Sequence, residues 1–305
     1  MSSTPQSDSG TLSPGSDDRS LTMVVRDKLS FDFESDIPRY WFKNDPLHTR
    51  FADAMSIMLP LGERFVMDCV REQRDRVADD KALAGEVDRF IRQEASHSLQ
   101  HRKDQQRLKK QGLDVDGIVT EQALITKRMH RLLPPAFKMS MAAAMEHVTC
   151  AVSVAFVMQR ELHEQCDPRM LSFYVWHFME EVEHRDVCFD LFCASTGGGY
   201  FLRISGLLFA MPFLGFAALR LMDRLLKADG HDRKARLALW GSSFSKFFGA
   251  QGTFRPAAGP ILAYFKPGFD PRQLMVPSNY AAWAQEMAIS GSPALAATAS
   301  FPGAR

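Results

Sequence analysis

Two copies of the pattern Glu-x-x-His constrain this chain more than any other feature of its sequence. The first copy places Glu94 three residues before His97, and the second places Glu181 three residues before His184. On an α-helix, residues three apart lie on one face, about one turn from each other. The two side chains of each copy can therefore bind the same metal ion if the surrounding segment is helical.

Each copy also has a glutamate upstream in an apolar segment. Glu63 precedes the first copy and Glu146 precedes the second. Two helix pairs, each contributing Glu and Glu-x-x-His, form the ligand set of carboxylate-bridged di-iron and di-manganese four-helix bundles. The sequence therefore predicts an all-α fold: a ferritin-like four-helix bundle with additional C-terminal helices and two metal ions in its core.

The predicted ligands have three roles. Glu94 and Glu181 bridge the two ions and are the catalytic carboxylates, the upstream glutamates are terminal ligands, and each histidine binds one ion. Oxygen-rich ligands with imidazoles suit iron or manganese better than structural zinc, so iron is the expected metal and manganese the alternative. The six predicted ligands are Glu63, Glu94, His97, Glu146, Glu181 and His184.

Two further histidines share the inner helix face. His101 lies four residues after His97, and His177 lies four residues before Glu181. His101 is interpreted as an extra ligand or as a hydrogen-bond donor that fixes a carboxylate. His177 is interpreted first as a buried, hydrogen-bonded histidine beside Trp176, with a ligand role as the alternative.

Other titratable residues nearby are expected outside the centre. His147 points about 100° away from Glu146 on its helix, so it is left out of the ligand set. Glu180 and Glu183 are expected to point elsewhere. Asp186 or Asp190 is expected to orient the histidines. At the polar end of a helix, Glu161, His163 and Glu164 are expected to face solvent.

Helical periodicity and breakers divide the chain into four parts. The predicted parts are a disordered tail at 1–37, the metal-binding bundle at 38–196, a helical extension at 197–275, and a C-terminal helix with a flexible tail at 276–305. The bundle helices are expected to begin at Pro46, at about 82, at Pro135 and at about 169, and the last is expected to run to 195. The connection 113–133 is expected to contain a short helix, and another helix is expected at 237–248.

A continuous apolar run of sixteen residues, 204–219, lies between Arg203 and Arg220. A membrane-spanning helix usually needs about 20 residues, so this run falls short. It is interpreted as a helix that covers the bundle or forms a homodimer interface, with peripheral membrane contact as the alternative.

Composition limits the compartment and the partners. The net charge is +1, which gives no reason to expect a nucleic acid as partner. Five cysteines without a Cys-x-x-Cys pair do not suggest a disulfide framework. The first twenty residues have no basic region followed by an apolar run, so we expect no secretory signal. The predicted location is the cytoplasm, with membrane association as the alternative.

Several segments resemble the bacterial family of predicted metal-dependent hydrolases. They lie at 38–41, 59–65, 93–97, 146–149 and 176–190, and the resemblance extends from Arg39 to Pro271. It implies a hydrolytic reaction at a bound metal. The chain departs from the family where Phe-His-Pro is expected, because it has Asp270 between Phe269 and Pro271.

Three functions are compatible with these observations. The first is an O2-activating oxidoreductase that uses an electron donor and acts on an apolar or lipid-like small molecule, because a buried apolar surround keeps an oxidant from water. The second is a hydrolase with water activated by two metal ions, and the third is ferritin-like iron oxidation or storage. The substrate pocket is expected to be lined by Met55, Met58, Phe65, Met145 and Phe178.

Overall fold

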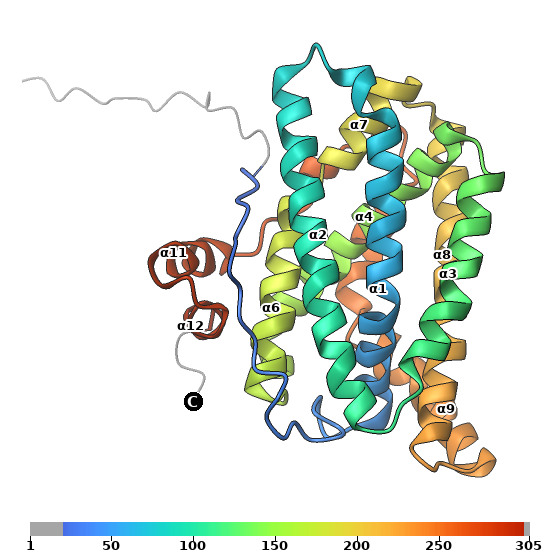
Figure 1. The fold of residues 1–305 in the computed structure, drawn as a ribbon, viewed down its shortest axis with the longest axis vertical. Coiled ribbons are helices and arrows are strands. Elements are labelled where there is room, and N and C mark those ends of the chain that lie inside the picture. Colours follow the sequence, from blue (N-terminus) through green and yellow to red (C-terminus); the bar gives the residue numbers. More distant parts are fainter. Residues whose placement is uncertain (1–20, 302–305) are drawn as a thin grey trace, which may run out of the picture.

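The structure, a computed structural model, describes residues 21–301, and its fold is all-α (Figure 1). Four long helices surround the core: α1 (Pro46–Gln73), α2 (Lys81–Lys110), α4 (Pro135–Val157) and α6 (Pro168–Glu183). Within the described residues, the only strand-like pairing is an isolated bridge between Phe42 and Cys166. The all-α prediction is confirmed.

Aspartate side chains begin most of these helices. Asp45, Asp80 and Asp167 each accept a hydrogen bond from a backbone N–H in the first turn of α1, α2 and α6. Proline follows the cap directly in α1 and α6 and, as Pro135, also begins α4. These residues satisfy or remove donors that a helix start leaves unpaired.

Helix α1 continues through Pro60, where the proline cannot donate to the carbonyl of Ser56. The side-chain amide of Gln105 on α2 donates to that carbonyl at 3.2 Å and to the carbonyl of Ile57 at 3.4 Å. A neighbouring helix therefore satisfies the acceptor that Pro60 leaves open. This contact helps to keep Glu63, one turn further on, at a fixed level in the bundle.

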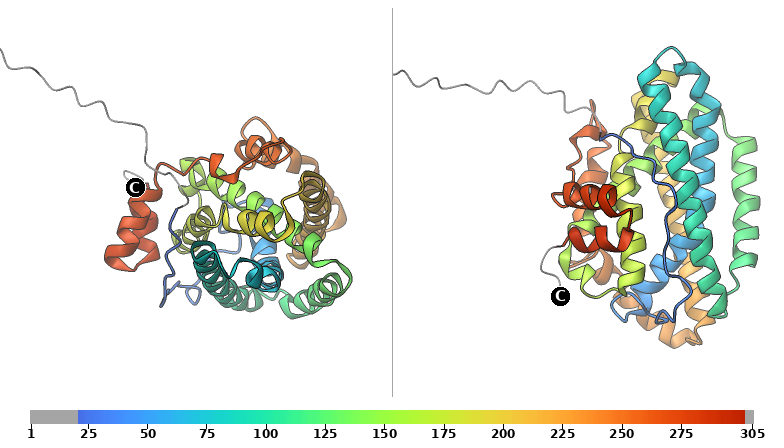
Figure 2. Two further views of the ribbon diagram at one scale, coloured as in Figure 1. Left: turned by 90° about the horizontal axis from the view of Figure 1, so that it is seen from above. Right: turned by 60° about the vertical axis from the view of Figure 1, so that its left-hand side comes forward.

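An outer layer covers one side of the bundle (Figure 2). It contains α3 (Val115–Leu132), α8 (Tyr200–Ala228) and α9 (Arg233–Phe248). The connection after α2, expected to contain only a short helix, is mostly α3. Helix α8 packs closely on α4 at Gly206, where an added Cβ would lie 2.5 Å from the Ser140 hydroxyl.

Within residues 21–301, two helices, α4 and α8, have the length and composition of membrane spans. The apolar window of α4 is 78% buried, as expected of a core helix, whereas that of α8 is only 28% buried. The run 204–219 therefore covers α4 with one face and leaves the other face uncovered.

The predicted fourth helix, 169–195, is not continuous. Helix α6 ends at Glu183, and α7 (Val187–Thr196) begins after a turn. Arg185 donates to the carbonyl of Leu274 at 3.3 Å, and Asp186 lies 3.6 Å from Arg272. The break thus occurs where these polar side chains turn towards the C-terminal segment, a contact that helical periodicity does not reveal.

The first and last segments of the described part, residues 21–37 and helices α11 and α12, pack near α6. Residues 21–37, expected in the tail, run along the bundle with Met23, Leu29 and Phe33 buried, whereas residues 1–20 lie outside the described part. At the other end, α11 (Tyr280–Ser290) and α12 (Pro293–Ala299) stand where a helix and a flexible tail were expected. Trp283 of α11 is fully buried in the cluster around α6.

Candidate metal centre

The two Glu-x-x-His units meet in the core of the bundle. Glu94, His97, Glu181 and His184 each offer one ligand atom, and these atoms all lie within 4.8 Å of one another. His184 Nδ1 is 2.9 Å from Glu94 Oε1, and His97 Nδ1 is 3.4 Å from Glu181 Oε1. Each histidine thus faces a carboxylate of the other unit, so Glu94 and Glu181 lie between the two imidazoles.

The outer nitrogen of each histidine has a partner that fixes the ring. His97 Nε2 lies 3.0 Å from Glu180 Oε2, and His184 Nε2 lies 3.0 Å from Gln93 Oε1. Both partners are acceptors, so each Nε2 carries the proton and donates it. In its neutral form each ring would therefore present the lone pair of Nδ1 to the centre, as metal-binding histidines do.

A second layer holds these partners in place. Gln93 Nε2 donates to Glu183 Oε2 at 2.8 Å, which orients its oxygen towards His184. Arg26 forms 2.8 Å ion pairs with both Glu180 and Glu183. As expected, Glu180 and Glu183 stay outside the group of inward-facing ligands; their role in positioning the histidines was not predicted. Their place next to Glu181 was visible in the sequence, but their partner Arg26 lay in a segment interpreted as a tail.

Arg26 also connects the two chain ends to the centre. Its guanidinium lies 4.5 Å from the ring centroid of Trp283 on α11. Tyr280, at the start of the same helix, donates to Glu183 at 2.7 Å. The N-terminal segment and α11 thus stabilise the residues that orient His97 and His184.

His177 ends a chain of hydrogen bonds with defined donors. The Ser56 hydroxyl donates to Asp104 at 2.6 Å and accepts from His101 Nδ1 at 2.9 Å. His101 Nε2 is then an acceptor, and His177 Nδ1 donates to it at 3.3 Å. Nε2 of His177 therefore has a free lone pair, which lies 3.2 Å from Glu181 Oε1. Burial lowers the pKa of both histidines, so both rings are neutral.

Glu63 and Glu146 complete the centre from α1 and α4. Glu63 accepts a 2.6 Å hydrogen bond from Ser98, and its other oxygen lies 4.0 Å from His101 Nε2. Glu146 Oε2 lies 3.7 Å from His184 Nδ1. Glu63 therefore joins a group with His101 and His177, while Glu146 lies beside His184.

The electrostatics of this cluster favour positive charge. Burial and nearby carboxylates raise the pKa of Glu146 to about 8 and raise the pKa of Glu63 well above its usual value. Burial opposes a charge on His97 and His184, but the surrounding carboxylates outweigh it and raise the pKa of both well above the usual value. Carboxylates that stabilise a cation here fit a site for metal ions.

Unsatisfied polar atoms support the same conclusion. Buried polar atoms normally have hydrogen-bond partners, and each exception requires an explanation. Here several inward-facing atoms lack a hydrogen bond to any residue in the described part, and bound metal ions would satisfy them together. These atoms are Glu63 Oε1, both Glu94 oxygens, His97 Nδ1, Glu146 Oε2, His177 Nε2, Glu181 Oε2 and His184 Nδ1.

Three other expectations have mixed outcomes. His147 faces away from the centre, as expected, and lies 3.0 Å from the carbonyl of Pro260. Asp186 and Asp190 pair with Arg272, so the prediction that they orient the histidines is wrong. His163 is buried against the carbonyl of Phe156, although it was expected to face solvent.

Asp270, which replaces the histidine expected from the family pattern, also contacts Arg272. One of its oxygens lies 3.0 Å from a guanidinium nitrogen of that arginine. Arg272 thus gathers three carboxylates, from Asp186, Asp190 and Asp270, at the break between α6 and α7. This group supports the turn after His184 from outside the centre.

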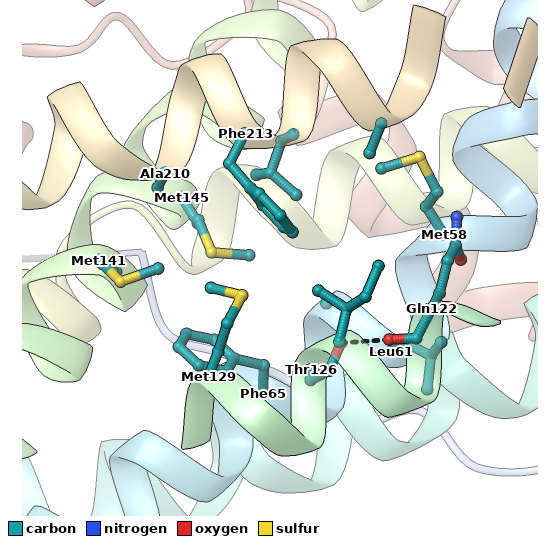
Figure 3. Close-up of a pocket in the computed structure, with 14 residues that line it drawn as sticks. Met58, Leu61, Phe65, Gln122, Thr126, Met129, Met141, Met145, Ala210 and Phe213 are labelled. Carbon is teal, nitrogen blue, oxygen red and sulfur yellow. Dashed lines mark hydrogen bonds between the residues drawn. The ribbon is translucent and has the colours of Figure 1, made fainter. Parts of the chain in front are cut away.

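An apolar pocket of about 80 Å³ lies between α1, α3, α4 and α8 (Figure 3). Met58, Phe65 and Met145 line it as predicted, whereas Met55 and Phe178 pack elsewhere. Its walls include Gly62 and Met145, the residues directly before Glu63 and Glu146. The pocket therefore adjoins the helix turns that carry two of the centre's carboxylates.

The exposed fractions of the centre's residues agree with a pocket beside Glu63 and Glu146. Glu63 and Glu146 retain 5% and 6% of their exposure, while Glu94, Glu181 and the histidines retain 2% or less. The least deeply buried residues of the centre therefore lie on α1 and α4. The same two helices form the inner wall of the pocket.

Comparison with known proteins gives one match. The family model described as predicted metal-dependent hydrolase matches residues 25–274, which include every residue of the centre and Arg26. No curated protein and no solved structure matches the chain. Since the family model spans most of the chain and its description agrees with a buried cluster suited to metal ions, the chain belongs to the family of predicted metal-dependent hydrolases.

Proposed function

We propose that the chain is a hydrolase with two metal ions in the bundle core and that its substrate is a small, largely apolar molecule. The observation that carries this proposal is the convergence of both Glu-x-x-His units, with ligand atoms within 4.8 Å of one another, in a member of this family. The apolar pocket beside Glu63 and Glu146 supports the substrate class.

The ligands divide into two unequal groups. Glu146 and His184 would hold one ion, and Glu63 and His97 would hold the other. Glu94 and Glu181 lie between the histidines, so they would contribute to both positions. His177 would add a third imidazole on the His97 side. Its Nδ1 is hydrogen-bonded to His101, so the lone pair of its Nε2 is free and faces Glu181.

Two bound divalent ions would polarise a substrate carbonyl and lower the pKa of a bound water. Glu146 would serve as a ligand to one of these ions. Burial and Glu181 raise its pKa to about 8 in the metal-free chain, and its Oε2 has no hydrogen bond to any described residue, so a bound ion would take the place of its proton. The Met and Phe side chains of the pocket exclude bulk water and orient the apolar part of the substrate.

The direct test is anaerobic hydrolysis of p-nitrophenyl esters by the full chain loaded with Zn(II) or Mn(II). We expect metal-dependent turnover that favours butyrate over acetate by roughly tenfold, since each of the two additional CH₂ groups contributes about 0.8 kcal/mol when buried. The Glu94→Ala/Glu181→Ala variant should have no activity. Glu164→Ala, at an exposed helix end, is the matched control and should retain it.

A second candidate is O2-dependent oxidation of the same class of substrate. It is favoured by the enclosure of a carboxylate-rich centre beside a pocket lined by Met and Phe, which keeps a reactive oxidant from water. The Fe(II) form exposed to O2 separates the candidates. Substrate-dependent O2 consumption with no hydrolysis by the Zn(II) or Mn(II) forms would replace the first proposal. Uptake of many more than two Fe(II) per chain would instead indicate iron storage.

A further inference from the structure

The exposed face of α8 is apolar over five turns. Between Tyr200 and Leu219 the only charged residue is Arg203, and it is buried, with its guanidinium donating to the carbonyl of Lys266 at 2.8 Å. The opposite side of the helix exposes large side chains, among them Phe201 (86%) and Phe216 (68%). The other apolar residues on this face are Leu208, Phe209, Pro212 and Leu219.

Helix α3 borders this face. Glu121 of α3 forms ion pairs with Arg220 and Arg224 of α8 at 2.8 and 2.7 Å, so the two helices lie side by side. On α3, the exposed residues Leu124 and Leu132 are four residues before and after Arg128, which places the three along one stripe. Apolar and basic side chains therefore alternate beside the apolar face of α8.

Unpaired basic residues surround the apolar area. Lys227 follows Phe209 by five full helical turns, so it lies on the same face of α8. Helix α9 repeats the pattern, because Leu237, Phe244 and Phe248 are exposed on a helix that begins with two basic residues. No ion pair joins any of these basic residues to the described part of the chain: Lys127, Arg128, Arg131, Lys227, Arg233 and Lys234.

The pocket opens between these same helices. Phe213 of α8 lines it (Figure 3). Ile125 of α3 also lines it and is exposed at the surface. Phe209, one turn before Phe213, packs edge-on against Phe137 with ring centroids 5.5 Å apart. An apolar path therefore leads from the exposed face, between α3 and α8, to the turns that carry Glu63 and Glu146.

We propose that the exposed sides of α3, α8 and α9 dock on an anionic lipid bilayer and admit an apolar substrate from it to the pocket. The uncharged face of α8 enters the acyl boundary, while the basic residues contact anionic headgroups and extend their charged ends to them. Docking depends only on this surface, whereas the reaction of the admitted substrate rests on the function proposed above.

The test is co-sedimentation of the full, metal-loaded chain with vesicles. One set contains phosphatidylcholine alone, and the other also contains phosphatidylglycerol. The variant Phe201→Asp/Phe216→Asp places charge on the docking face, while Ile289→Asp/Leu295→Asp places the same charge on exposed residues of α11 and α12. These two helices lie on the opposite side of the bundle from α3 and α8 (Figures 1 and 2).

We expect the chain and the Ile289/Leu295 control to bind phosphatidylglycerol vesicles at least tenfold more tightly than the Phe201/Phe216 variant does. Lys227→Glu/Arg128→Glu should remove the preference for anionic vesicles. Equal binding by the Phe201/Phe216 variant, or no binding by the unaltered chain, would overturn the proposal. A dimer in vesicle-free sedimentation velocity that Phe201→Asp/Phe216→Asp dissociates would assign the face to a second copy of this chain instead.

Two measurements keep this result separate from the hydrolase proposal. Vesicle binding by Glu94→Ala/Glu181→Ala should equal that of the unaltered chain, since docking does not need the metal ions. Where hydrolysis is present, the ratio of turnover on a vesicle-embedded ester to turnover on a water-soluble ester should fall at least tenfold in Phe201→Asp/Phe216→Asp. Vesicle binding without hydrolysis would overturn only the proposed hydrolase reaction. Hydrolysis without vesicle binding would overturn only the proposed docking face.

Discussion

The two Glu-x-x-His units are alike in sequence but occupy unlike positions. His97 lies well inside the uninterrupted helix α2, whereas His184 is the residue that ends α6 before the turn to α7. The outer nitrogen of His97 contacts a carboxylate, Glu180, while that of His184 contacts the amide of Gln93. A carboxylate partner makes an imidazole a stronger metal ligand than an amide does.

The additional histidine increases this asymmetry. His177 and its chain of partners lie on the His97 side, whereas Glu146 serves the His184 side. A repeated ligand pattern therefore does not produce two equivalent positions. We expect the ion beside His97 to be held more tightly than the ion beside His184, and the following changes test that difference.

The largest effect is expected from Glu94→Ala/Glu181→Ala. Both carboxylates lie between the two imidazoles, so their removal should abolish binding at both positions. Elemental analysis should find less than a tenth of the metal retained by the unaltered chain. The exposed control Glu164→Ala should keep its full content. Retention of both ions by the double variant would show that the bridging assignment is wrong.

His177→Ala should weaken metal binding at one of the two positions. If its Nε2 binds the ion on the His97 side, affinity there should fall roughly 10- to 100-fold while the second ion remains. Competition with a chelator of known affinity measures the two steps separately. His101→Ala leaves the inward nitrogen of His177 in place and removes only its partner, so we expect a smaller loss. An equal loss of both ions in His177→Ala would contradict the asymmetric assignment.

Arg26→Ala tests a residue that supports both metal positions. The arginine holds Glu180 and Glu183, which support His97 and His184, so both affinities should fall, each by about tenfold. Loss of a buried ion-pair partner should also lower the free energy of unfolding by about 3 kcal/mol. Urea unfolding and chelator competition measure the two effects, and Arg26→Lys should restore part of each. A loss confined to one position would mean that Arg26 supports only one histidine.

A change of pH should alter metal affinity more modestly than these substitutions do. The raised pKa of Glu146, about 8, means that metal binding at pH 7 displaces a proton from this carboxyl. Affinity on the His184 side should therefore increase by up to about tenfold per pH unit between pH 6 and 8 and level off above pH 8. Calorimetry in buffers of different ionisation enthalpy measures the released protons. Metal binding without proton release would contradict the raised pKa.

The same shifts affect the stability of the metal-free chain. Glu63, Glu146, His97 and His184 all have a folded pKa above the unfolded value, so each contributes less to stability as pH rises through its folded value. The metal-free chain should thus lose stability from pH 6 to 8. Metal ions should reverse this trend, which thermal unfolding with and without chelator can measure.

The smallest effect is expected from Arg272→Ala. This arginine contacts Asp186, Asp190 and Asp270 behind the break but none of the inward-facing ligands. Its side chain is partly exposed, so the loss in unfolding free energy should be about 1 kcal/mol or less. Metal content should not change. A marked loss of the ion beside His184 would show that the turn after α6 must be held for that position to form.

Local sequence signals were sufficient to predict the starts of the four bundle helices and the identity of the inner ligand candidates. Prolines and the onset of helical apolar periodicity predicted the starts of α1, α2, α4 and α6 closely, because these signals act within a few residues. The spacing of Glu94 and His97, and of Glu181 and His184, required one helix face for each pair. Local geometry alone is enough for such predictions.

The residues that orient those ligands became apparent only from contacts between segments far apart in the chain. Glu180, Glu183 and Gln93 act through partners far away in the chain, and Arg26 reaches them from an extended segment that has no periodicity to detect. The break after His184 likewise coincides with contacts to Leu274 and Arg272, almost ninety residues later. Helical patterns report which side of a segment is apolar, whereas hydrogen bonds between segments depend on distances that arise only when the chain has folded.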